Sequence, residues 1–215
     1  MVAAVRALVK NAVFDHVPGI LRRGPATSRR VALTFDDGPD DFTARYLDVL
    51  DELAVPATFF LIGARAAERP DLVRDYLRRG HQVASHGWDH TRFTKLSRRA
   101  LLDQCTRTEA AIGLQLSGRP WVRPPHGSLD ASSVVNLLVT GYTVAMWSVD
   151  SCDYEIRDPA ALAARCAPGQ GRVGPGDVLL FHEGQQWTLD ALPRIVTALR
   201  ADGYECVTML DLGTV

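Results

Sequence analysis

The chain has 215 residues, with 24 lysines and arginines against 25 aspartates and glutamates, so its formal net charge is -1. This near balance argues against nucleic acid or another polyanion as the partner. The length suits one large α/β domain, and four scattered cysteines without CxxC spacing exclude a disulfide scaffold and predict reduced thiols.

Residues 1–30 are expected to form an N-terminal helical arm and a basic linker. Valines recur at helical spacing in the first half, and arginines follow as far as Arg30. We favour a helix packed across the open end of the domain, and the alternative is a peripheral membrane arm. No signal-like apolar core and no apolar run of about 18 residues are present, which predicts a cytoplasmic protein, with membrane association as the alternative.

Residues 31–215 are expected to form one catalytic domain in which strands and helices alternate. Strands are predicted at residues 31–35, 57–61, 81–85, near 122, 142–147, 178–181 and 204–207. Helices fit between them, for example from Pro70 to Gly80, after Ser97 and after the Asp158-Pro159 pair. About seven alternations without a Gly- or Ser-rich linker predict a mostly parallel sheet and favour a (β/α) barrel over an open sheet.

The stretch VALTFDDGP, from Val31 to Pro39, delivers two carboxylates to a strand end. Asp36 and Asp37 follow the strand, and Gly38 with Pro39 ends it, at the edge where α/β folds carry their active sites. Two adjacent carboxylates repel each other, so a metal or a cation is expected nearby. The alternative is a solvated turn.

A pair of histidines follows the strand at 81–85. The H-x-x-x-H spacing of His86 and His90 brings both imidazoles together on a helix face or in a tight turn, and neutral imidazole nitrogens suit zinc and similar divalent ions. The alternative is two loop histidines of structural use.

Titratable residues also follow three later strands. Arg123, held by two prolines, could orient a carboxylate such as Asp36 and keep it ionised, the alternative being a surface arginine on a proline turn. Asp150 follows the strand at 142–147, and His182 ends the strand at 178–181. We interpret His182 as an acid or base partner of an adjacent strand-end acid, the alternative being a core histidine.

Taken together, the motifs TFDDG, SHGWDH, RPPHG, DSCDY and LLFH resemble, in order and spacing, the five motifs of the NodB-homology polysaccharide deacetylases, carbohydrate esterase family four. The resemblance extends from Val31 to Leu212. It implies a distorted, incomplete (β/α) barrel of about seven strands. It also implies metal-dependent hydrolysis of the acetamide of an N-acetylhexosamine unit in an oligosaccharide, polysaccharide or lipid-linked sugar.

The resemblance also implies roles for single residues. The metal, most simply Zn²⁺ with Co²⁺ or Mn²⁺ as alternatives, would be held by Asp37, His86 and His90. Asp36 would be the general base and Arg123 would position it. His182 would be the general acid, with Asp150 tuning it. The substrate-binding positions would be His126, whose backbone N–H could complete an oxyanion site, Tyr154, and Leu180 for the acetyl methyl.

Departures from the family pattern bear on the substrate more than on the chemistry. Gly87 stands where a hydroxyl residue is common, His126 where tyrosine is usual, Tyr154 where tryptophan is common and Glu183 where aspartate is frequent. An alternative function is therefore an amidohydrolase of the same fold that acts on a formyl group, a cyclic imide or a natural-product amide. An inactive sugar-binding module is the remaining alternative, but such modules tend to lose a ligand or the base, and every one of these positions is filled here.

Overall fold

The computed structural model describes residues 17–113, 119–169 and 173–213. Within these ranges one sheet contains nine strands. They are β1 (Ile20–Leu21), β2 (Arg30–Asp36), β3 (Thr58–Leu61), β4 (Gln82–Ser85), β5 (Trp121–Val122), β6 (Thr143–Ala145), β7 (Val149–Asp150), β8 (Val178–His182) and β9 (Glu205–Val207).

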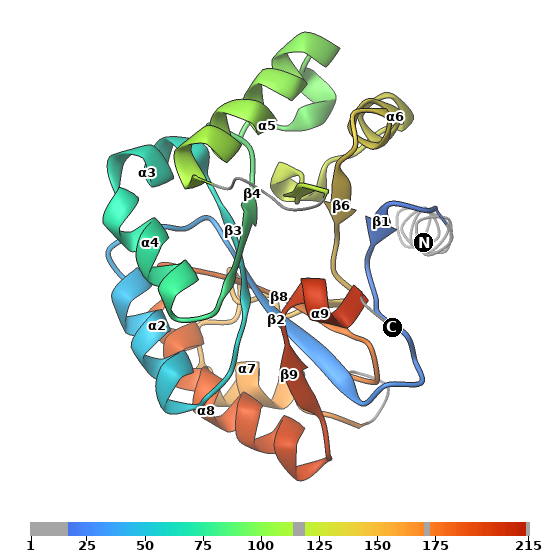
Figure 1. Cartoon of the computed structure of the whole chain (residues 1–215). Helices are drawn as coiled ribbons and strands as arrows, with labels where there is room; N and C mark the ends of the chain where they lie inside the picture. The colour runs from blue at the N-terminus through green and yellow to red at the C-terminus, as the bar shows by residue number, and fades with distance from the viewer. Residues whose placement is uncertain (1–16, 114–118, 170–172, 214–215) are drawn as a thin grey trace.

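The sheet is parallel and curls without closing (Figure 1). Its order is β1-β6-β5-β4-β3-β2-β8-β7, and β9 pairs with the start of β2. Because β1 and β7 stand at opposite ends of this order and do not pair in the described part of the chain, the barrel is incomplete. The predicted fold class is confirmed, with two very short strands, β1 and β7, in addition to the seven expected.

Helices surround the sheet. They are α2 (Thr43–Glu52), α3 (Gly63–Glu68), α4 (Pro70–Arg78), α5 (Arg98–Ile112), α6 (Ala131–Val139), α7 (Pro159–Arg165), α8 (Gln186–Ala201) and α9 (Met209–Gly213), with 3₁₀ turns η1 (Phe93–Lys95) and η2 (Pro125–Gly127). Ser97 caps α5, and Asp158 caps α7 with Pro159 in its first turn, as their sequence types favour.

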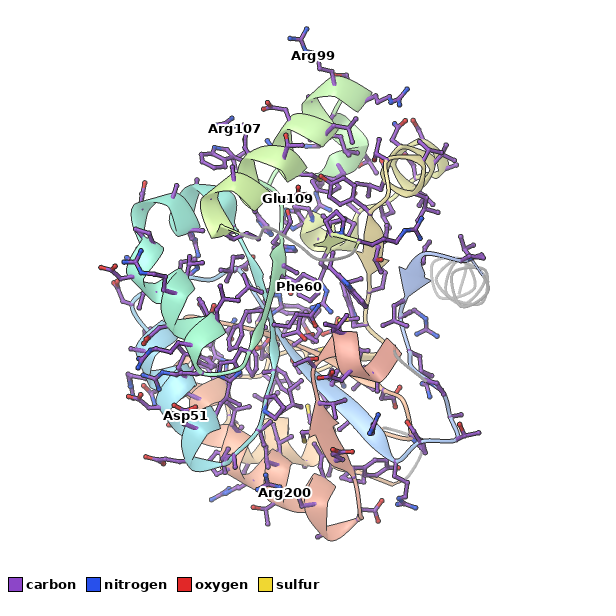
Figure 2. All side chains as sticks on the ribbon, in the orientation of Figure 1. Asp51, Phe60, Arg99, Arg107, Glu109 and Arg200 are labelled. Carbon is purple, nitrogen blue, oxygen red and sulfur yellow. The ribbon has the colours of Figure 1, made fainter. Side chains whose placement is uncertain are left out.

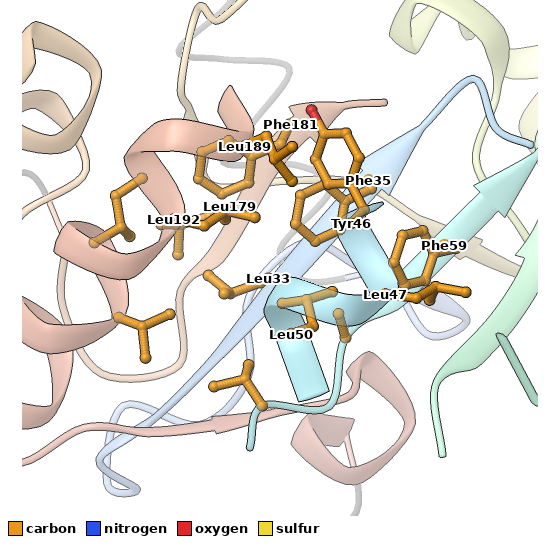
Figure 3. Packing of buried hydrophobic residues seen from close by; sticks show 14 of the residues in the cluster. Leu33, Phe35, Tyr46, Leu47, Leu50, Phe59, Leu179, Phe181, Leu189 and Leu192 are labelled. Atoms are coloured by element: carbon orange, nitrogen blue, oxygen red, sulfur yellow. The ribbon is translucent and has the colours of Figure 1, made fainter. Parts of the chain in front are cut away.

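The main core lies between the outer face of the sheet and the helices α2, α4 and α8. Phe35 of β2 stacks on Phe59 of β3 and on Phe181 of β8, with ring centroids 5.1 and 5.6 Å apart (Figure 3). Tyr46 of α2 meets the Phe35 ring edge-on. These rings are fully buried, so the strands that carry Asp36 and His182 are anchored immediately below the ends where those residues lie.

A second hydrophobic cluster, which contains several alanines, fills the interior of the barrel. Ala32, Ala84 and Ala145 leave space that Phe60 and the side chain of Met209 fill, and Figure 2 shows Phe60 within the curl of the sheet. The backbone N–H of Met209 donates to the hydroxyl of Thr58, at the first residue of β3. Helix α9 therefore packs against the barrel at the amino ends of the strands.

Part of the segment 1–30, expected to be a helical arm and a basic linker, contributes a strand to the sheet. Strand β1 pairs with β6, matching Ile20 with Val144, so the sheet begins ahead of the expected boundary at residue 31. Two-residue strands lack a periodicity that the sequence could reveal. Residues 1–16, which carry the predicted helix, lie outside the described residues.

Two further observations concern the whole chain as described. The four cysteines are free thiols. Among the described residues, no helix combines the length and the apolar character that crossing a bilayer requires.

Candidate active site

The site lies where the carboxyl ends of β2, β4 and β8 meet. The register pairs Asp36 of β2 with His182 of β8, so two of the predicted residues end neighbouring strands at the same level. A pocket of about 460 Å³ opens here. Its lining includes every predicted site residue except Arg123: Asp36, Asp37, His86, His90, His126, Asp150, Tyr154, Leu180 and His182.

Three of these side chains converge in a way that suits a metal ion. The Oδ1 atom of Asp37 lies 3.6 Å from Nε2 of His86 and 3.3 Å from Nε2 of His90. One possible ligand atom from each residue lies within 4.8 Å of the others. Asp37 and His90 both have left-handed backbones, with φ of 74° and 63°, a conformation that non-glycine residues adopt where their surroundings impose it.

The residues of this group fit a divalent cation. Nδ1 of His86 is hydrogen-bonded to the carbonyl oxygen of Arg123 at 2.8 Å, which leaves Nε2 to face Asp37. Oδ1 of Asp37 is buried and has no hydrogen-bond donor among the described residues. Burial lowers the pKa of His90 to about 4, so its imidazole is neutral at neutral pH. A carboxylate oxygen and two neutral imidazoles are ligands that a divalent transition ion accepts.

Asp36 points into the pocket from the end of β2 and is held from behind by Arg123. The guanidinium donates from Nη1 to Oδ1 of Asp36 at 2.7 Å and to the hydroxyl of Thr34 at 2.8 Å. Arg123 is completely buried and its Cζ lies 4.0 Å from the centroid of the Phe60 ring. The alternative of a surface arginine on a proline turn is therefore wrong.

Nη2, the second terminal nitrogen of the Arg123 guanidinium, contacts groups in the interior of the barrel. Nη2 donates to the carbonyl oxygen of Met146 at 3.2 Å and lies 3.6 Å from the sulfur of Met209 in α9. A planar guanidinium with contacts on both sides has little rotational freedom. The position of the Asp36 carboxylate is thus fixed through Arg123 by the interior of the barrel.

The partner of His182 is Asp153, and not Asp150 as the sequence led us to expect. Oδ1 of Asp153 lies 2.7 Å from Nδ1 of His182, while Oδ2 accepts from the backbone N–H of His182 at 2.7 Å and from the hydroxyl of Thr188 at 3.0 Å. Asp150 instead accepts from the backbone N–H of Cys152 at 2.8 Å, and its Oδ2 lies 3.5 Å from the Tyr154 hydroxyl.

A turn after β7 explains why Asp153, and not Asp150, contacts His182. Asp150 is the last residue of that strand, opposite Leu180, and the chain reverses at Cys152, whose φ is 57°. After this turn Asp153 is fully buried and contacts the His182 ring. The motif DSCDY contains both aspartates, so the sequence held the correct residue, but spacing alone did not distinguish the two.

This pairing changes the acidity of His182. Burial lowers the pKa of the imidazole, but the hydrogen bond and the charge of Asp153, with smaller contributions from Asp36 and Asp37, outweigh it and raise the pKa to about 9. Since Nδ1 is bound to Asp153, Nε2 is the nitrogen left for the pocket. His182 is thus a cationic donor at neutral pH.

The remaining walls of the pocket are apolar and aromatic. Leu180 and Trp147 line it, with His126 and Tyr154 more exposed, and the His126 ring lies 4.3 Å from the His90 ring. Gly127 is needed here because a Cβ at that position would lie 2.6 Å from the Trp147 ring. Trp147 and Glu183 also line the pocket. The sequence analysis did not consider Trp147, and it named Glu183 only as a departure from the family pattern.

Comparison with known proteins gives a consistent result. The family model described as polysaccharide deacetylase matches residues 23–145. The chain is 35% identical over 188 residues to a peptidoglycan-N-acetylglucosamine deacetylase PgdA of Listeria monocytogenes serotype 1/2a (strain 10403S), covering 86% of this chain but only 39% of that protein. It is 34% identical over 208 residues to a chitooligosaccharide deacetylase of Sinorhizobium fredii (strain NBRC 101917 / NGR234), covering 89% of this chain and 94% of that one.

A solved structure extends the likeness to three dimensions. The Bc1960 peptidoglycan N-acetylglucosamine deacetylase, in complex with a naphthalenyl N-oxidanyl-benzamide, superposes with a TM-score of 0.85 at 29% identity. The match covers 92% of this chain and 94% of that one.

Proposed function

Because the chain belongs to the polysaccharide deacetylase family, we propose that it is a divalent-metal-dependent hydrolase that removes the acetyl group from an N-acetylhexosamine unit of an oligosaccharide, polysaccharide or lipid-linked sugar. The observation that carries the proposal is one pocket that holds three kinds of group. They are the metal-ligand set Asp37, His86 and His90, the Asp36 carboxylate, and the cationic imidazole of His182.

Asp36 is assigned as the general base. Its Oδ1 is occupied by Arg123, and its Oδ2 lies 3.6 Å from Nε2 of His86, so the second oxygen faces the metal-ligand set. A base in this position can take a proton from a water that attacks the amide carbon. Arg123 contributes by holding the carboxylate in one orientation.

Asp37, His86 and His90 would hold the divalent ion. When bound, such an ion polarises the amide carbonyl and makes the attacking water more acidic. We propose Zn²⁺ because one carboxylate and two imidazoles with an open position are a common catalytic zinc set, and Co²⁺ or Mn²⁺ could substitute.

His182 is assigned as the general acid. The leaving group of amide hydrolysis is an amine, which departs only when it receives a proton. Nε2 of His182 can supply that proton because Asp153 keeps the imidazole charged up to about pH 9. Asp36 and His182 end adjacent strands, so one substrate carbon can lie between them.

The pocket walls would select and orient the acylated sugar. Leu180 would contact the acetyl methyl group, and Tyr154 and His126 would meet the sugar ring at the more exposed part of the pocket. We also assign the backbone N–H of His126 to the oxyanion that develops on the carbonyl. Asp150, which lines the pocket without touching His182, would contact substrate rather than tune the acid.

A release assay tests the proposal. Purified protein with added Zn²⁺ is incubated with chito-oligosaccharides, peptidoglycan fragments, a lipid-linked N-acetylglucosamine and an N-acetylated glycoside of natural-product type. Their N-formyl counterparts and a cyclic imide are tested in parallel. We expect acetate from at least one sugar. Hydrolysis of only the formyl compounds or the imide would establish the alternative amidohydrolase activity, and binding without turnover would establish a sugar-binding module.

A further inference from the structure

We propose that Glu183 is a positioning residue of the metal site, which fixes the backbone turn that aims Asp37 at His86 and His90. Glu183 follows the general acid in the chain, and its carboxyl group is hydrogen-bonded to the hydroxyls of Thr43 and Tyr76. The inference rests on the proposed function only in taking Asp37 as a metal ligand.

The carboxyl group of Glu183 is held by two buried hydroxyls. Oε1 accepts from the hydroxyl of Thr43 at 3.0 Å, and Oε2 accepts from that of Tyr76 at 2.8 Å. Glu183 is 4% exposed, and both hydroxyl residues are fully buried. No ion pair to Glu183 occurs within residues 17–113, 119–169 and 173–213, so its hydrogen bonds, and not a charge partner, hold it in place.

This carboxyl group packs directly against the turn after Asp37. A Cβ placed on Gly38 would lie 1.5 Å from Oε2 of Glu183 and 2.8 Å from the Tyr76 hydroxyl. The backbone of Gly38 therefore rests on the Glu183 carboxyl with no room for a side chain. The hydroxyl of Thr43 also accepts from the backbone N–H of Asp40 at 2.8 Å, which ties the far end of the same turn to the cluster.

Asp37 depends on this backbone support because its ligand atom has no other. Its Oδ1 has no hydrogen-bond partner among the described residues. Its φ of 74° belongs to a conformation that non-glycine residues adopt only when their surroundings impose it. From the outer side Arg65 donates to the carbonyl oxygen of Asp37 at 2.6 Å, but that arginine is exposed. The buried cluster of Glu183, Tyr76 and Thr43 is the firmer support.

Metal affinity is the property that this role predicts. Outer groups that orient a ligand change metal affinity by roughly 10- to 100-fold when removed. We expect Glu183→Ala to weaken Co²⁺ binding by that factor and to alter the visible absorption of the bound Co²⁺. Tyr76→Phe, which keeps the Thr43 bond, should weaken binding less. Glu183→Gln, which keeps the shape and an acceptor oxygen, should largely restore affinity.

The measurement is equilibrium dialysis of metal-stripped protein against Co²⁺ at a temperature where every variant is folded. Leu199→Ala serves as the control, because Leu199 is fully buried near the other end of α8, about 20 Å along the helix from its start. We expect it to lower the melting temperature without changing Co²⁺ affinity. If Glu183→Ala also lowers only the melting temperature and binds Co²⁺ like wild type, Glu183 is a structural residue and the inference is wrong.

The same experiments distinguish a failure of this inference from a failure of the proposed function. Weakened Co²⁺ binding by Glu183→Ala in a protein whose wild type releases no acetate supports the positioning role and refutes the deacetylase assignment. Acetate release by the wild type together with unchanged Co²⁺ binding by Glu183→Ala does the reverse.

Discussion

Replacing Asp153 with asparagine tests the corrected assignment of the acid pair. Asp153 bonds Nδ1 of His182 at 2.7 Å, and the pKa of His182 is about 9 against an ordinary 6.5. A raised folded-state pKa means that the cationic form persists through neutral pH and is lost as pH rises through 9. The difference corresponds to about 3 kcal/mol of stabilisation of the imidazolium, at about 1.36 kcal/mol per pKa unit.

The magnitude can be worked out at two pH values. With a pKa near 9, about 90% of His182 is protonated at pH 8, whereas with a pKa near 6.5 only about 3% is. Titration alone therefore predicts a loss of about 30-fold in kcat at pH 8 for Asp153→Asn, and less than about twofold at pH 6. The maximal rate should fall as well, because an amide can hold the wrong imidazole tautomer, so the diagnostic quantity is the position of the alkaline limb.

The assay is acetate release by metal-saturated enzyme from pH 5 to 10. Asp150→Asn is the matched control, because it removes a carboxylate three residues away in the same motif that does not contact His182. We expect its limb to stay near pH 9 while that of Asp153→Asn moves down by one unit or more. A limb that moves in Asp150→Asn and stays in place in Asp153→Asn would refute the reasoning.

Chelation should abolish activity, and Zn²⁺, Co²⁺ or Mn²⁺ should restore it; full activity in protein shown to be metal-free by elemental analysis would contradict the assignment of the ligands. Asp36→Asn should retain the metal and lose turnover by at least about 100-fold, whereas Asp37→Asn should lose the metal; elemental analysis showing the opposite pattern reverses their roles. Burial lowers the pKa of His81 to about 4, so its stabilising contribution is complete above pH 6.5 and is lost as pH falls. Between pH 6.5 and 5, the free energy of unfolding measured in urea should therefore fall by about 2 kcal/mol more for wild type than for His81→Gln. If this free energy falls equally with pH in both proteins, His81 does not titrate in that range. Deleting residues 1–16, which keeps β1, should lower the melting temperature by several degrees if they pack on the barrel; unchanged melting with loss of flotation on anionic liposomes would support the membrane arm instead.

The proposed metal ligands came from the family resemblance, and the alignment of parallel strand ends explains why they lie together. Asp37 follows β2 and His86 follows β4, and both strands pair with β3, so the positions are brought together by the register alone. A short turn after His86 is then enough to bring His90 to the same place. The register also pairs Asp36 with His182, the last residue of the adjacent strand.

The errors arose where the chain leaves regular structure. Strand β7 has two residues and is followed by a left-handed residue, Cys152. The segment is therefore too short for an alternation of apolar and polar residues to show whether Asp150 or Asp153 contacts His182. Strand β1 is equally short, and within the described residues it pairs with β6 alone. The sequence analysis related Glu183 only to the substrate, because its partners Thr43 and Tyr76 are 140 and 107 residues away in sequence.

The contact between Met209 and Arg123 has a consequence for engineering this molecule. Met209 belongs to α9 at the amino ends of the strands, yet its sulfur touches the guanidinium that holds Asp36. A change in α9 would therefore change the support of Asp36, the proposed base, although α9 does not line the pocket. Rate optimisation that samples only the loops around the mouth would overlook it. Under the proposed mechanism, residues at the amino ends of the strands offer a second place from which turnover could be tuned without a change in the residues that line the pocket.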